Sequence, residues 1–599
     1  MKNLRFKLNT TCVLICLTLA QSCQDHFLEL EPVGTTNEII LANKSGLNKL
    51  LIGAYAALPL YDNFFGVSNS LFGSMASDDA YVGSFGDIPD QEIIERYAYD
   101  GTNPSISGKW EVLYGGVQRA NDVLRTLALA EPGVLSDEDA KQIKAEAVFL
   151  RGVFHLEAAK MWRNIPYITE EKFSFENNDF PELFLDNSKP VWPGLEKDFL
   201  FAAENLSETN PEVGRANSWA AKAFLAKVYM FEHKFSEAKV LLEDILAHGV
   251  TPLNVKYDLV NFADNFNPVT QNNAESVFSV QSSVNDGAEG YNGNMGDIFS
   301  MPLIGMASSG GATRPSFSLV NSYKTDAQTG LPLISTFNDF DVKSDMNLEA
   351  TDPFTPYDGP LDPRLDWTVG RRGIPTFDHG LGTRAWVYNQ PVGGPFFNKK
   401  CFYWSKDEEA VTSAVMGWAQ ATANNYNMIR FADVLLWAAE AEVEVGSLNK
   451  AEEYVNRVRR RAADPAGWVK TYVDDSKPSL GFTDTPAANY KIGLYNGTFT
   501  ARGKEYAREA VRFERKIEFA MEGHRFFDLQ RYDNGSGYMA NALNAYIAHD
   551  TSIPGFENPS EKGAVFVKGK HEVYPIPQRE IDLSVKNGVS LLKQNPGYE

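Results

Sequence analysis

Aromatic side chains interleaved with polar ones are the residues of this chain best suited to binding chemistry. The clearest run is Arg384-Ala-Trp386-Val-Tyr388-Asn389-Gln390. A sugar ring has C–H faces that pack on aromatic rings, and hydroxyl groups that hydrogen-bond to planar polar side chains. If the run is extended, Trp386 and Tyr388 lie on one face. We therefore predict that this segment binds an uncharged oligosaccharide, with Arg384 and Asn389 as polar partners.

Other segments carry the same combination of rings and polar groups. The further candidates for glycan contact are Tyr81, Asp79, Asp78, Tyr291, Tyr403 and Trp404, with Asn292 beside Tyr291. The alternative interpretation is that these rings fill a hydrophobic core beneath long loops, because large aromatic side chains are often buried.

An acidic stretch between Asp339 and Asp366 holds eight acidic residues. Within it, Asp345, Asn347 and Glu349 are spaced at alternate positions and offer the hard oxygen ligands that calcium prefers. The segment lacks the central glycine of an EF-hand loop. A solvated acidic loop is the preferred interpretation and calcium the alternative; no other cofactor is predicted.

Catalytic motifs are absent from the sequence. It contains no P-loop, no dinucleotide-binding glycine pattern, no HExxH helix and no GxSxG elbow. The neighbouring carboxylates Asp78 and Asp79 are adjacent in sequence, which does not place two acids across a sugar ring as a glycosidase requires. We expect a protein that is not an enzyme, and a glycoside hydrolase remains the alternative.

The N-terminus has the pattern of a bacterial lipoprotein signal. Three basic residues precede a short apolar run, and Ala20-Gln-Ser-Cys23 follows it. The run is too short to span a bilayer. We predict cleavage after residue 22 and a lipid on Cys23, which would attach the chain to a membrane. An ordinary secretory signal with an incidental cysteine is the alternative.

The composition describes a large folded protein. The chain has 599 residues, of which 43% are hydrophobic, 12% aromatic and 22% charged, and its formal net charge is −22. This hydrophobic content excludes a wholly disordered chain. The acidic balance argues against a nucleic-acid-binding protein, which normally carries a basic surface.

Helical hairpins are predicted in two places. In residues 217–248, a small residue recurs after twelve positions, from Ala226 to Ala238, and the same step links Ala439 to Ala451 in residues 434–461. A small residue at the close crossing of each helix is typical of tetratricopeptide-like pairs. Generic helical hairpins remain the alternative.

Further helices are expected at residues 46–58, 110–130, 136–161, 191–206 and 506–521. Between residues 251 and 425 the periodicity fades and Gly, Pro, Asn, Asp and aromatic residues dominate; only 276–281 is expected as a strand. Long loop-rich regions in compact proteins are usually functional. The predicted organisation is therefore a signal peptide at 1–22, a helical region at 23–250, a ligand-binding region at 251–425 and a helical region at 426–599.

Several motifs occur in a fixed order behind the predicted signal. They are Phe27-Leu-Glu-Leu-Glu-Pro32, Ser77-Asp-Asp-Ala-Tyr81, Glu146-Ala-Val-Phe-Leu-Arg151, Arg430-Phe-Ala-Asp-Val-Leu-Leu436, the segment from Glu514 to Leu529, and Tyr574-Pro-Ile-Pro-Gln578. Taken together, the chain resembles the SusD/RagB family of outer-membrane nutrient-binding lipoproteins over nearly its whole length.

The resemblance implies a mainly α fold, with a helical scaffold of four tetratricopeptide-like pairs and a large loop-rich insertion carrying few short strands. It implies a lipid-anchored protein on the cell surface that captures oligosaccharide and passes it to a SusC-like TonB-dependent outer-membrane transporter. It also implies ligand contacts near the Ser-Asp-Asp segment and in the central loops. Alternatives are a peptide cargo, or a helical-repeat scaffold protein without ligand.

The motif that begins at Glu514 also has a structural interpretation. Glu514, Arg515, Glu518, Glu522 and Arg525 are spaced for ion pairs along one helix. Aromatic residues at 519, 526 and 527 can anchor that helix in a core. We expect this motif to stabilise the fold rather than to touch ligand.

Overall fold

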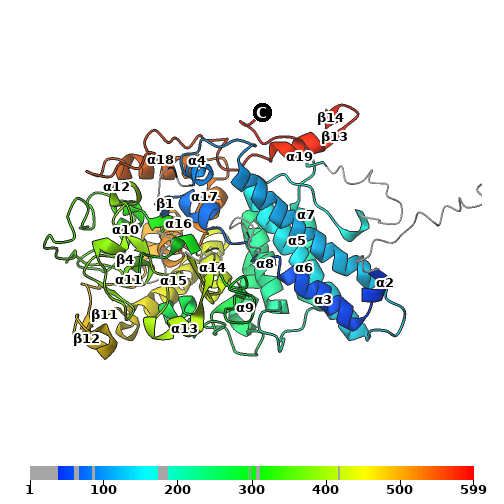
Figure 1. The fold of residues 1–599 in the computed structure, drawn as a ribbon, viewed down its shortest axis with the longest axis horizontal. Coiled ribbons are helices and arrows are strands. Elements are labelled where there is room, and N and C mark those ends of the chain that lie inside the picture. The colour runs from blue at the N-terminus through cyan, green and yellow to red at the C-terminus, as the bar shows by residue number, and fades with distance from the viewer. Residues whose placement is uncertain are drawn as a thin grey trace, which may run out of the picture.

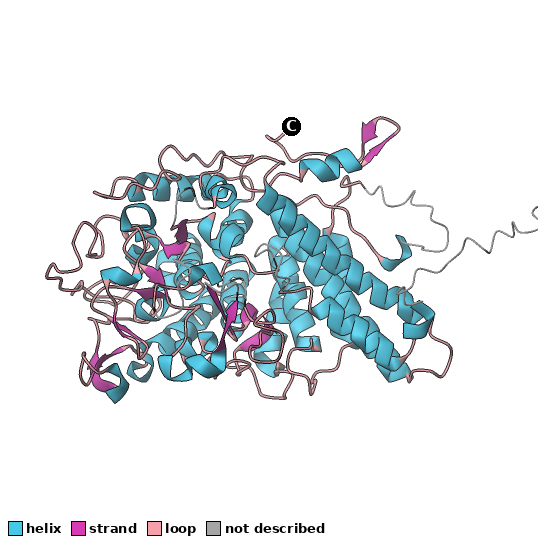
Figure 2. Cartoon of the chain, viewed as in Figure 1, coloured by secondary structure: helices cyan, strands magenta, loops and turns pink. Residues whose placement is uncertain are grey.

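The computed structural model describes residues 38–59, 66–83, 86, 88–172, 186–294, 296, 298–304, 311–415 and 419–599. The predicted lipid anchor, Cys23, lies outside these residues. The described part is mainly helical, with short strands paired two by two (Figures 1 and 2). The mainly α fold class is thus confirmed.

The α-helices are α2 (Glu38–Leu41), α3 (Lys44–Tyr55), α4 (Pro89–Glu95), α5 (Pro104–Ala128), α6 (Asp137–Trp162), α7 (Trp192–Asn205), α8 (Ser218–Phe231), α9 (Phe235–His248), α10 (Phe317–Ser322), α11 (Leu365–Thr368), α12 (Gln390–Gly393), α13 (Glu408–Val411), α14 (Phe431–Val445), α15 (Leu448–Ala463), α16 (Thr498–Glu518), α17 (Arg525–Asp533), α18 (Tyr538–Asp550) and α19 (Gln578–Leu583). The strands are β1 (Ala80–Val82), β2 (Ser276–Val280), β3 (Thr313–Pro315), β4 (Val369–Gly370), β5 (Pro375–Thr376), β6 (Gly380–Leu381), β7 (Phe397–Asn398), β8 (Thr412–Val415), β9 (Ala419–Thr422), β10 (Tyr426–Arg430), β11 (Lys470–Tyr472), β12 (Phe482–Pro486), β13 (Val585–Lys586) and β14 (Val589–Ser590).

The long helices form a continuous stack. Helices α3, α5, α6, α7, α8, α9, α14, α15 and α16 each contact the next in this order, and the first eight make four successive pairs (Figure 1). Helix α9 packs on α14 although residues 249–430 separate them in sequence. The loop-rich segment is therefore an insertion between two consecutive helical pairs of one scaffold.

Local sequence explains where these helices begin. The side chains of Asn103, Ser136 and Asn217 accept hydrogen bonds from the first turns of α5, α6 and α8. Such N-caps satisfy backbone N–H groups that have no partner within the helix. Helix α6 also carries acids in its first turn, which suits the helix dipole.

The two predicted helical hairpins are present. Ala226 of α8 and Ala238 of α9 are fully buried, as are Ala439 of α14 and Ala451 of α15. The predicted helix at 506–521 begins earlier, at Thr498, and bends at Gly503, whose φ is 81°. Helices α17 and α18 were not predicted. Nearly every residue of α17 is buried, so it has no polar face that would give a helical period. The buried residues of α18 do follow a helical period, so its signal was present in the sequence and was missed.

The loop-rich segment attaches to the scaffold through short sheets and a shared core. The strand predicted at 276–281 is present as β2 and pairs antiparallel with β10, which leads directly into α14. Apolar residues of this segment, such as Phe278, Phe317 and Leu361, belong to the same core cluster as the scaffold helices. The segment is thus folded onto the scaffold rather than separate from it.

A close backbone contact joins two segments that lie far apart in the chain. Gly73 lies in a π-helical turn (Ser70–Met75), and a Cβ on Gly73 would come within 1.9 Å of the Gly523 carbonyl oxygen. Gly523 itself has a φ of 79° and donates its N–H to the Ser74 hydroxyl at 3.1 Å. Glycine is needed at 73 for space and at 523 for the left-handed backbone. This contact brings the Ser77–Tyr81 motif against the turn between α16 and α17.

Buried ion pairs surround the carboxylate of Glu518, near the end of α16. One oxygen accepts from Arg430 at 3.1 Å and from Arg461 at 2.5 Å, and the other accepts from Arg364 at 2.9 Å. Arg364 belongs to the loop-rich segment, Arg430 to the N-cap of α14 and Arg461 to α15. One buried carboxylate therefore joins three separate parts of the fold.

The motif from Glu514 to Arg525 is structural, but not through ion pairs along one helix. Glu514 pairs with Arg459 at 2.9 Å, Arg515 with Asp528 at 3.0 Å and Arg525 with Asp78 at 2.7 Å. Arg515 and Glu518 share α16 but pair with residues of other segments, whereas Glu522 lies in the turn after α16 and Arg525 begins α17. The charged side chains of this motif instead form ion pairs with residues that are distant in sequence or lie on the next helix.

None of the helices in the described part of the chain is long and apolar enough to cross a lipid bilayer.

Replacing Glu518 by glutamine tests the role of this buried cluster. Glu518→Gln leaves three guanidinium groups short of one counter-charge, so we expect the free energy of unfolding to fall by about 3 kcal/mol or more. Burial alone would raise the pKa of Glu518, but Arg461, Arg430 and Arg364 lower it below its ordinary value. The stabilisation is therefore present above about pH 4 and is lost as the pH falls further.

The matched control is Glu453→Gln on α15, which removes an exposed pair with Arg460. Exposed pairs contribute about 0–1 kcal/mol. Urea denaturation at pH 7 measures both variants, and equal effects of the two substitutions would contradict the assigned role of Glu518.

Candidate ligand-binding site

A cavity of about 750 Å³ opens where the scaffold meets the loop-rich segment. Four segments line it: the end of α3, residues 212–215 between α7 and α8, residues 279–283 at the end of β2, and Tyr291 with Asn292. This volume lies within the range of small-ligand sites.

The loop that carries Tyr291 is built around Asp286. One carboxylate oxygen of Asp286 accepts from the Ser283 hydroxyl at 2.5 Å and from the Asn292 amide at 2.8 Å. The other accepts from the Ala288 N–H at 3.0 Å. These hydrogen bonds lower the pKa of Asp286 to about 2, so its carboxylate stays charged and holds the loop closed. The Tyr291 side chain is 54% exposed at the cavity rim.

One wall of the cavity carries paired charges. Arg215 pairs with Glu212 and, at 3.3 Å, with the buried Glu146. The Tyr55 hydroxyl donates to Glu146 at 2.8 Å and accepts from the Ala216 N–H at 3.0 Å. Burial raises the pKa of Glu146, while Arg215 opposes that rise. The guanidinium of Arg215 is thus balanced by neighbouring carboxylates before any ligand arrives.

The side chain of Gln281 is held in place against residues 212–215, where a Cβ on Gly214 would meet it at 2.6 Å. It exchanges hydrogen bonds with the Asn272 side chain at 2.8 and 3.0 Å, and its oxygen also accepts from Asn425 at 3.1 Å. Its nitrogen also donates to the Ser279 carbonyl oxygen at 3.1 Å, so both N–H groups and both lone pairs of the amide are engaged within the protein. Gln281 therefore shapes the cavity wall. The lining amide that can meet a ligand is that of Asn292, which is oriented by its donation to Asp286 at 2.8 Å.

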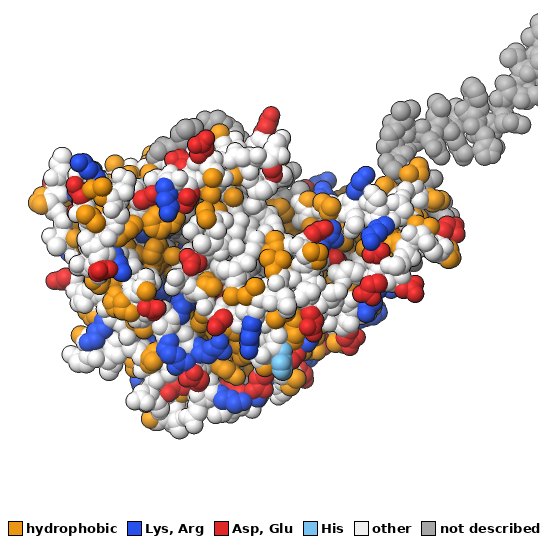
Figure 3. All heavy atoms as spheres, turned by 90° about the horizontal axis from the view of Figure 1, so that it is seen from below, with side chains coloured by type: hydrophobic (Ala, Val, Ile, Leu, Met, Phe, Trp, Pro, Cys, Tyr) orange, Lys and Arg blue, Asp and Glu red, His pale blue; other side chains and the backbone are white. Residues whose placement is uncertain are grey.

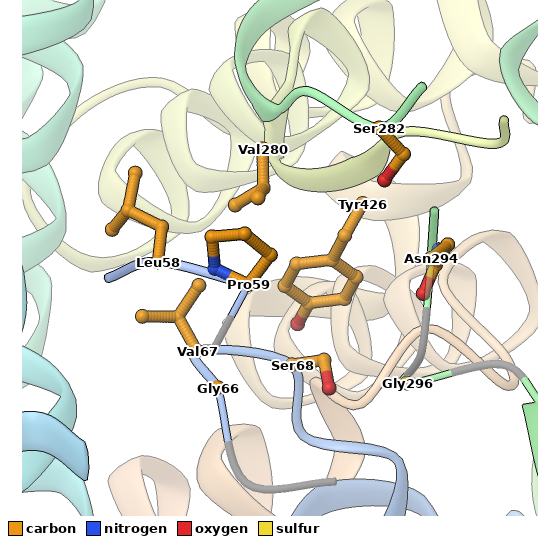
Figure 4. Close-up of a pocket in the computed structure, with 10 residues that line it drawn as sticks. All are labelled: Leu58, Pro59, Gly66, Val67, Ser68, Val280, Ser282, Asn294, Gly296 and Tyr426. Carbon is orange, nitrogen blue, oxygen red and sulfur yellow. The ribbon is translucent and has the colours of Figure 1, made fainter. Parts of the chain in front are cut away.

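A smaller recess of about 20 Å³ lies beside the main cavity, and the two share Leu58, Pro59, Val280 and Ser282. Figure 4 shows Leu58, Pro59, Val67 and Val280 on one side of the Tyr426 ring and Asn294 on the other. The apolar side chains of Leu58, Pro59 and Val280 therefore line both the recess and the cavity.

Together these features form a pocket with an aromatic rim, amide and hydroxyl groups on its walls, and balanced charge. Among the described lining residues, Glu212 and Arg215 are the charged ones. This composition suits a ligand that has both apolar faces and hydroxyl groups and carries no strong net charge.

The predicted platform around Trp386 has a different form from the expected one. Residues Arg384–Trp386 form a 3₁₀ turn, and Asn389 has a left-handed backbone with a φ of 46°. The run is therefore not extended, and the expected common face of Trp386 and Tyr388 is wrong. The Trp386 ring packs edge-on against Phe397, with centroids 6.0 Å apart.

The other groups of this segment have separate roles. Tyr388 is 50% exposed, and Asn389 is exposed as well. Arg384 donates to the side chain of Gln390. None of the four predicted platform residues lines the large cavity. Their contact with glycan stays a prediction for a surface distinct from the cavity.

The Ser-Asp-Asp segment lies in the core. Tyr81 is fully buried, its ring packs 4.7 Å from Phe556, and its hydroxyl donates to Asp550. Asp78 pairs with Arg525 at 2.7 Å and Lys516 at 2.9 Å. These three predicted ligand-binding residues, Tyr81, Asp78 and the buried Asp79, therefore take the core-filling role that was the alternative.

Asp79 is the least compensated of these groups. It is fully buried, and one oxygen accepts from the Met521 N–H at 3.1 Å. Burial and the neighbouring charge of Asp78 raise its pKa to about 7. The two adjacent carboxyl groups therefore differ: Arg525 and Lys516 keep Asp78 ionised, whereas Asp79 exchanges its proton near pH 7.

The remaining aromatic candidates are also mostly covered. Tyr403 is buried, and its hydroxyl donates to the Gln420 side chain at 2.8 Å. Trp404 is half-buried between Phe377 and Phe482, at centroid distances of 5.4 and 5.9 Å. Of the aromatic residues proposed from the sequence, the cavity includes Tyr291.

The calcium alternative finds no support in the arrangement of its three residues. Asp345 is buried beside Arg372, at 3.6 Å, and accepts from Gln390 at 3.2 Å. Asn347 donates to the Pro554 carbonyl at 2.7 Å, away from that pair. A guanidinium next to the carboxylate opposes a bound cation. Across the described residues, no three His, Cys, Asp or Glu side chains are grouped to hold a metal ion.

The sequence did not point to Tyr55, Arg215 or Gln281. They lie on three segments that are far apart in the chain and become neighbours only through the packing of α3, α8 and β2. A local motif would not have revealed them.

Charge on the molecular surface is mixed. On the face in Figure 3, Lys and Arg side chains gather near the lower middle, with Asp and Glu side chains among them. A mixed surface does not attract a polyanion as a uniform basic patch does.

Known proteins match the chain over almost its whole length. A family model described as "SusD family" matches residues 274–598, and one described as "Starch-binding associating with outer membrane" matches residues 26–230. The chain belongs to the SusD family. The expected SusD/RagB resemblance is thereby confirmed.

Relatives within the SusD family share limited sequence identity. "SusD-like protein P2" of Formosa agariphila is 24% identical over 99% of this chain and 100% of its own. A "SusD-like protein" of Bacteroides ovatus is 27% identical over 44% of this chain and 47% of its own.

Solved SusD-like structures share the fold. A SusD-like protein from Bacteroides fragilis superposes with a TM-score of 0.65 at 17% identity, covering 94% of this chain and 99% of its own. Surface glycan-binding protein A from Bacteroides thetaiotaomicron, in complex with laminarihexaose, gives a TM-score of 0.58 at 18% identity. The match covers 92% of this chain and 99% of that protein.

The raised pKa of Asp79 makes a prediction about stability. The folded state resists ionising this carboxyl, so the wild type loses stability as the pH rises from about 4 through 7. Asp79→Asn removes that penalty and keeps an acceptor for the Met521 N–H. We expect the variant to be more stable than wild type at pH 8, by up to about 3 kcal/mol, and to lose this advantage near pH 4.

Thermal unfolding followed by circular dichroism from pH 4 to 8 measures the effect. A stability difference that does not change with pH would show that Asp79 is ionised in the folded protein throughout.

Proposed function

We propose that this protein binds an oligosaccharide in the cavity beside Tyr291, at the bacterial cell surface. The observation that carries the proposal is the cavity itself. It has an exposed tyrosine ring at the rim, the Asn292 amide oriented by Asp286, and one internally paired Arg–Glu couple. A neutral sugar chain can stack on the ring and hydrogen-bond to the Asn292 amide without bringing charge of its own.

The comparisons support a glycan as the ligand class. One family model carries the description of starch binding, and a SusD-like protein of the same fold was solved with laminarihexaose. The sugar that this chain takes is not specified by those relatives, because their sequence identity is low. A peptide would have to bind in the same cavity. The calorimetric titration below includes peptides, so it would detect this alternative.

Binding without catalysis is part of the proposal. Hydrolysis of a glycosidic bond by the common mechanism needs two carboxyl groups flanking the bond. Among the described lining residues of the cavity, Glu212 is the one acid, and it is engaged with Arg215.

We also propose a lipid anchor on Cys23 and delivery of the bound glycan to a SusC-like TonB-dependent transporter. The signal-like sequence before Cys23 supports the anchor. The description of the N-terminal family model, which includes association with the outer membrane, supports the location. The cavity lies where the helical stack meets the loop-rich segment, and we propose that the helices face the transporter.

Substitution of Tyr291 tests the cavity. A stacked sugar covers roughly 60 Å² of the ring, which corresponds to about 1.5 kcal/mol and about a tenfold loss of affinity in Tyr291→Ala. Isothermal titration calorimetry against a panel of neutral glycans, charged glycans and peptides first identifies a ligand and then measures the variant.

Tyr388→Ala is the matched control, because Tyr388 is equally exposed but lies outside the cavity. Circular dichroism verifies that both variants fold. If Tyr388→Ala loses affinity and Tyr291→Ala retains it, the ligand binds the 384–389 segment and the cavity assignment is wrong.

The anchor is tested by cell fractionation. Cys23→Ala should move the protein from the membrane fraction to the soluble fraction, because the variant lacks the thiol that carries the lipid. The measurement is made in cells without the transporter, so that protein contacts do not retain the variant. Retention of Cys23→Ala in the membrane under these conditions would rule out a lipid on Cys23.

A further inference from the structure

Two buried carboxyl groups from segments far apart in the chain lie against each other. Glu95 is the last residue of α4, and Glu561 lies between α18 and α19. Each residue is 1% exposed, and their side chains are within hydrogen-bonding reach of each other. Neither residue lines the ligand cavity.

Neutral donors occupy one oxygen of each carboxyl group. Oε1 of Glu95 accepts from the Val82 N–H at 3.0 Å and from the Asn558 side chain at 3.2 Å. Oε1 of Glu561 accepts from the Tyr546 hydroxyl at 2.8 Å. The second oxygen of each glutamate, Oε2, is buried and has no hydrogen-bond donor among the described residues. The oxygens left for contact between the two carboxyl groups are therefore ones that no N–H or O–H group satisfies.

No basic side chain in the described part of the chain pairs with these two glutamates. Arg96 and Lys562, their neighbours in sequence, form no ion pair with them. The nearest cation of the same network is His549, which contacts Asp550 at 2.6 Å and Asp341 at 3.2 Å. Although burial opposes it, these two carboxylates raise the pKa of His549 to about 9. The charge of His549 is thus already balanced by other acids.

The remaining titratable groups around the pair supply no positive charge either. They are Tyr97 after α4, Tyr81 on β1, Tyr546 and Asp550 on α18, and His571, whose ring stacks on Tyr97 with centroids 5.7 Å apart. Burial raises the pKa of the three tyrosines and lowers the pKa of His571 to about 4. Helix α5 also packs on α4, but its buried Lys109 donates to the carbonyls of Gly66 and Ser68.

Two ionised carboxylates in contact, buried and without a cation, are strongly disfavoured. A single proton between them removes one charge and turns the repulsion into a hydrogen bond, so the two groups titrate as a pair. We propose that Glu95 and Glu561 share one proton and form a pH-sensitive latch that fastens the end of α4 to residues 558–561. The Val82, Asn558 and Tyr546 donors then hold the one remaining negative charge. This proposal does not depend on the glycan cavity.

The pKa shifts of both carboxyl groups agree with a shared proton. Burial and the neighbouring Glu561 raise the pKa of Glu95, and burial raises the pKa of Glu561 to about 8. In an unfolded chain a glutamate ionises near pH 4. The folded protein therefore keeps a proton that the unfolded chain releases. The stability contributed by the latch consequently falls as the pH rises from about 4 through 8.

Glu561→Gln replaces the shared proton by a permanent donor, because its amide can donate to Glu95 and accept from Tyr546. Between pH 5 and pH 9, its melting temperature should rise by roughly 2–4 °C relative to that of the wild type. Glu557→Gln, at an exposed position nearby, is the control and should follow the wild type. Asp79 is unchanged in all three proteins, so its own pH dependence cancels. A difference between Glu561→Gln and wild type that is constant with pH overturns the proposal.

Infrared spectroscopy detects the proton itself. The difference spectrum between wild type and Glu561→Gln at pH 6 should contain the carbonyl stretch of one protonated carboxyl group, which shifts in heavy water. Two ionised carboxylates in the wild type would overturn the proposal, as would a loss of stability on adding EDTA, which would assign their compensation to a bound metal ion. If Glu561→Gln does not fold, Glu95→Gln takes its place, because it removes the same proton.

Hydrogen–deuterium exchange tests whether the pair holds the segment in place. At pH 9, peptides covering residues 551–570 should exchange faster in the wild type than in Glu561→Gln, whereas at pH 6 the two proteins should exchange at the same rate. Equal exchange at both pH values would show that the shared proton does not fasten this segment and would overturn the latch.

Discussion

The fold depends on a set of buried charges that must meet one another. Glu518 alone faces Arg364, Arg430 and Arg461, and each of these guanidinium groups has a further carboxylate partner. Charges buried in this way are tolerated only when each finds its partners with good geometry. The loop-rich segment, the N-terminus of α14 and helix α15 are consequently held in one arrangement. Hydrophobic burial provides most of the stabilisation, but it is not directional and does not by itself select that arrangement.

The same constraint positions the ligand cavity. Arg430 also pairs with Glu275 at 2.5 Å, immediately before β2, and the backbone of Phe431 donates to the Glu275 carbonyl at 2.7 Å. Strand β2 is thereby fixed against β10, and residues 279–283 at its end form one wall of the cavity. Further lining comes from α3 and the α7–α8 connection, where Tyr55, Glu146 and Arg215 form a second, smaller network. The cavity thus lies between two sets of buried charges, while its own lining is nearly neutral. This separation of structural charge from the cavity lining is consistent with the uncharged ligand that we propose.

Local patterns in the sequence determined the helices, because helical periodicity, small residues at Ala226 and Ala238, and capping residues such as Ser136 act within a few turns. Together with the ordered motifs they were enough to give the mainly α class and the SusD family. The sequence could not determine which aromatic rings are exposed. Tyr81 and Tyr291 have similar polar neighbours in sequence, yet Tyr81 is buried against Phe556 and Tyr291 is exposed at a cavity rim. Burial depends on contacts between residues hundreds of positions apart, and the cavity is formed by four such segments. Only the tertiary structure brings these together, because neither a hydrogen-bond partner nor a cavity wall is specified by the residues that flank it.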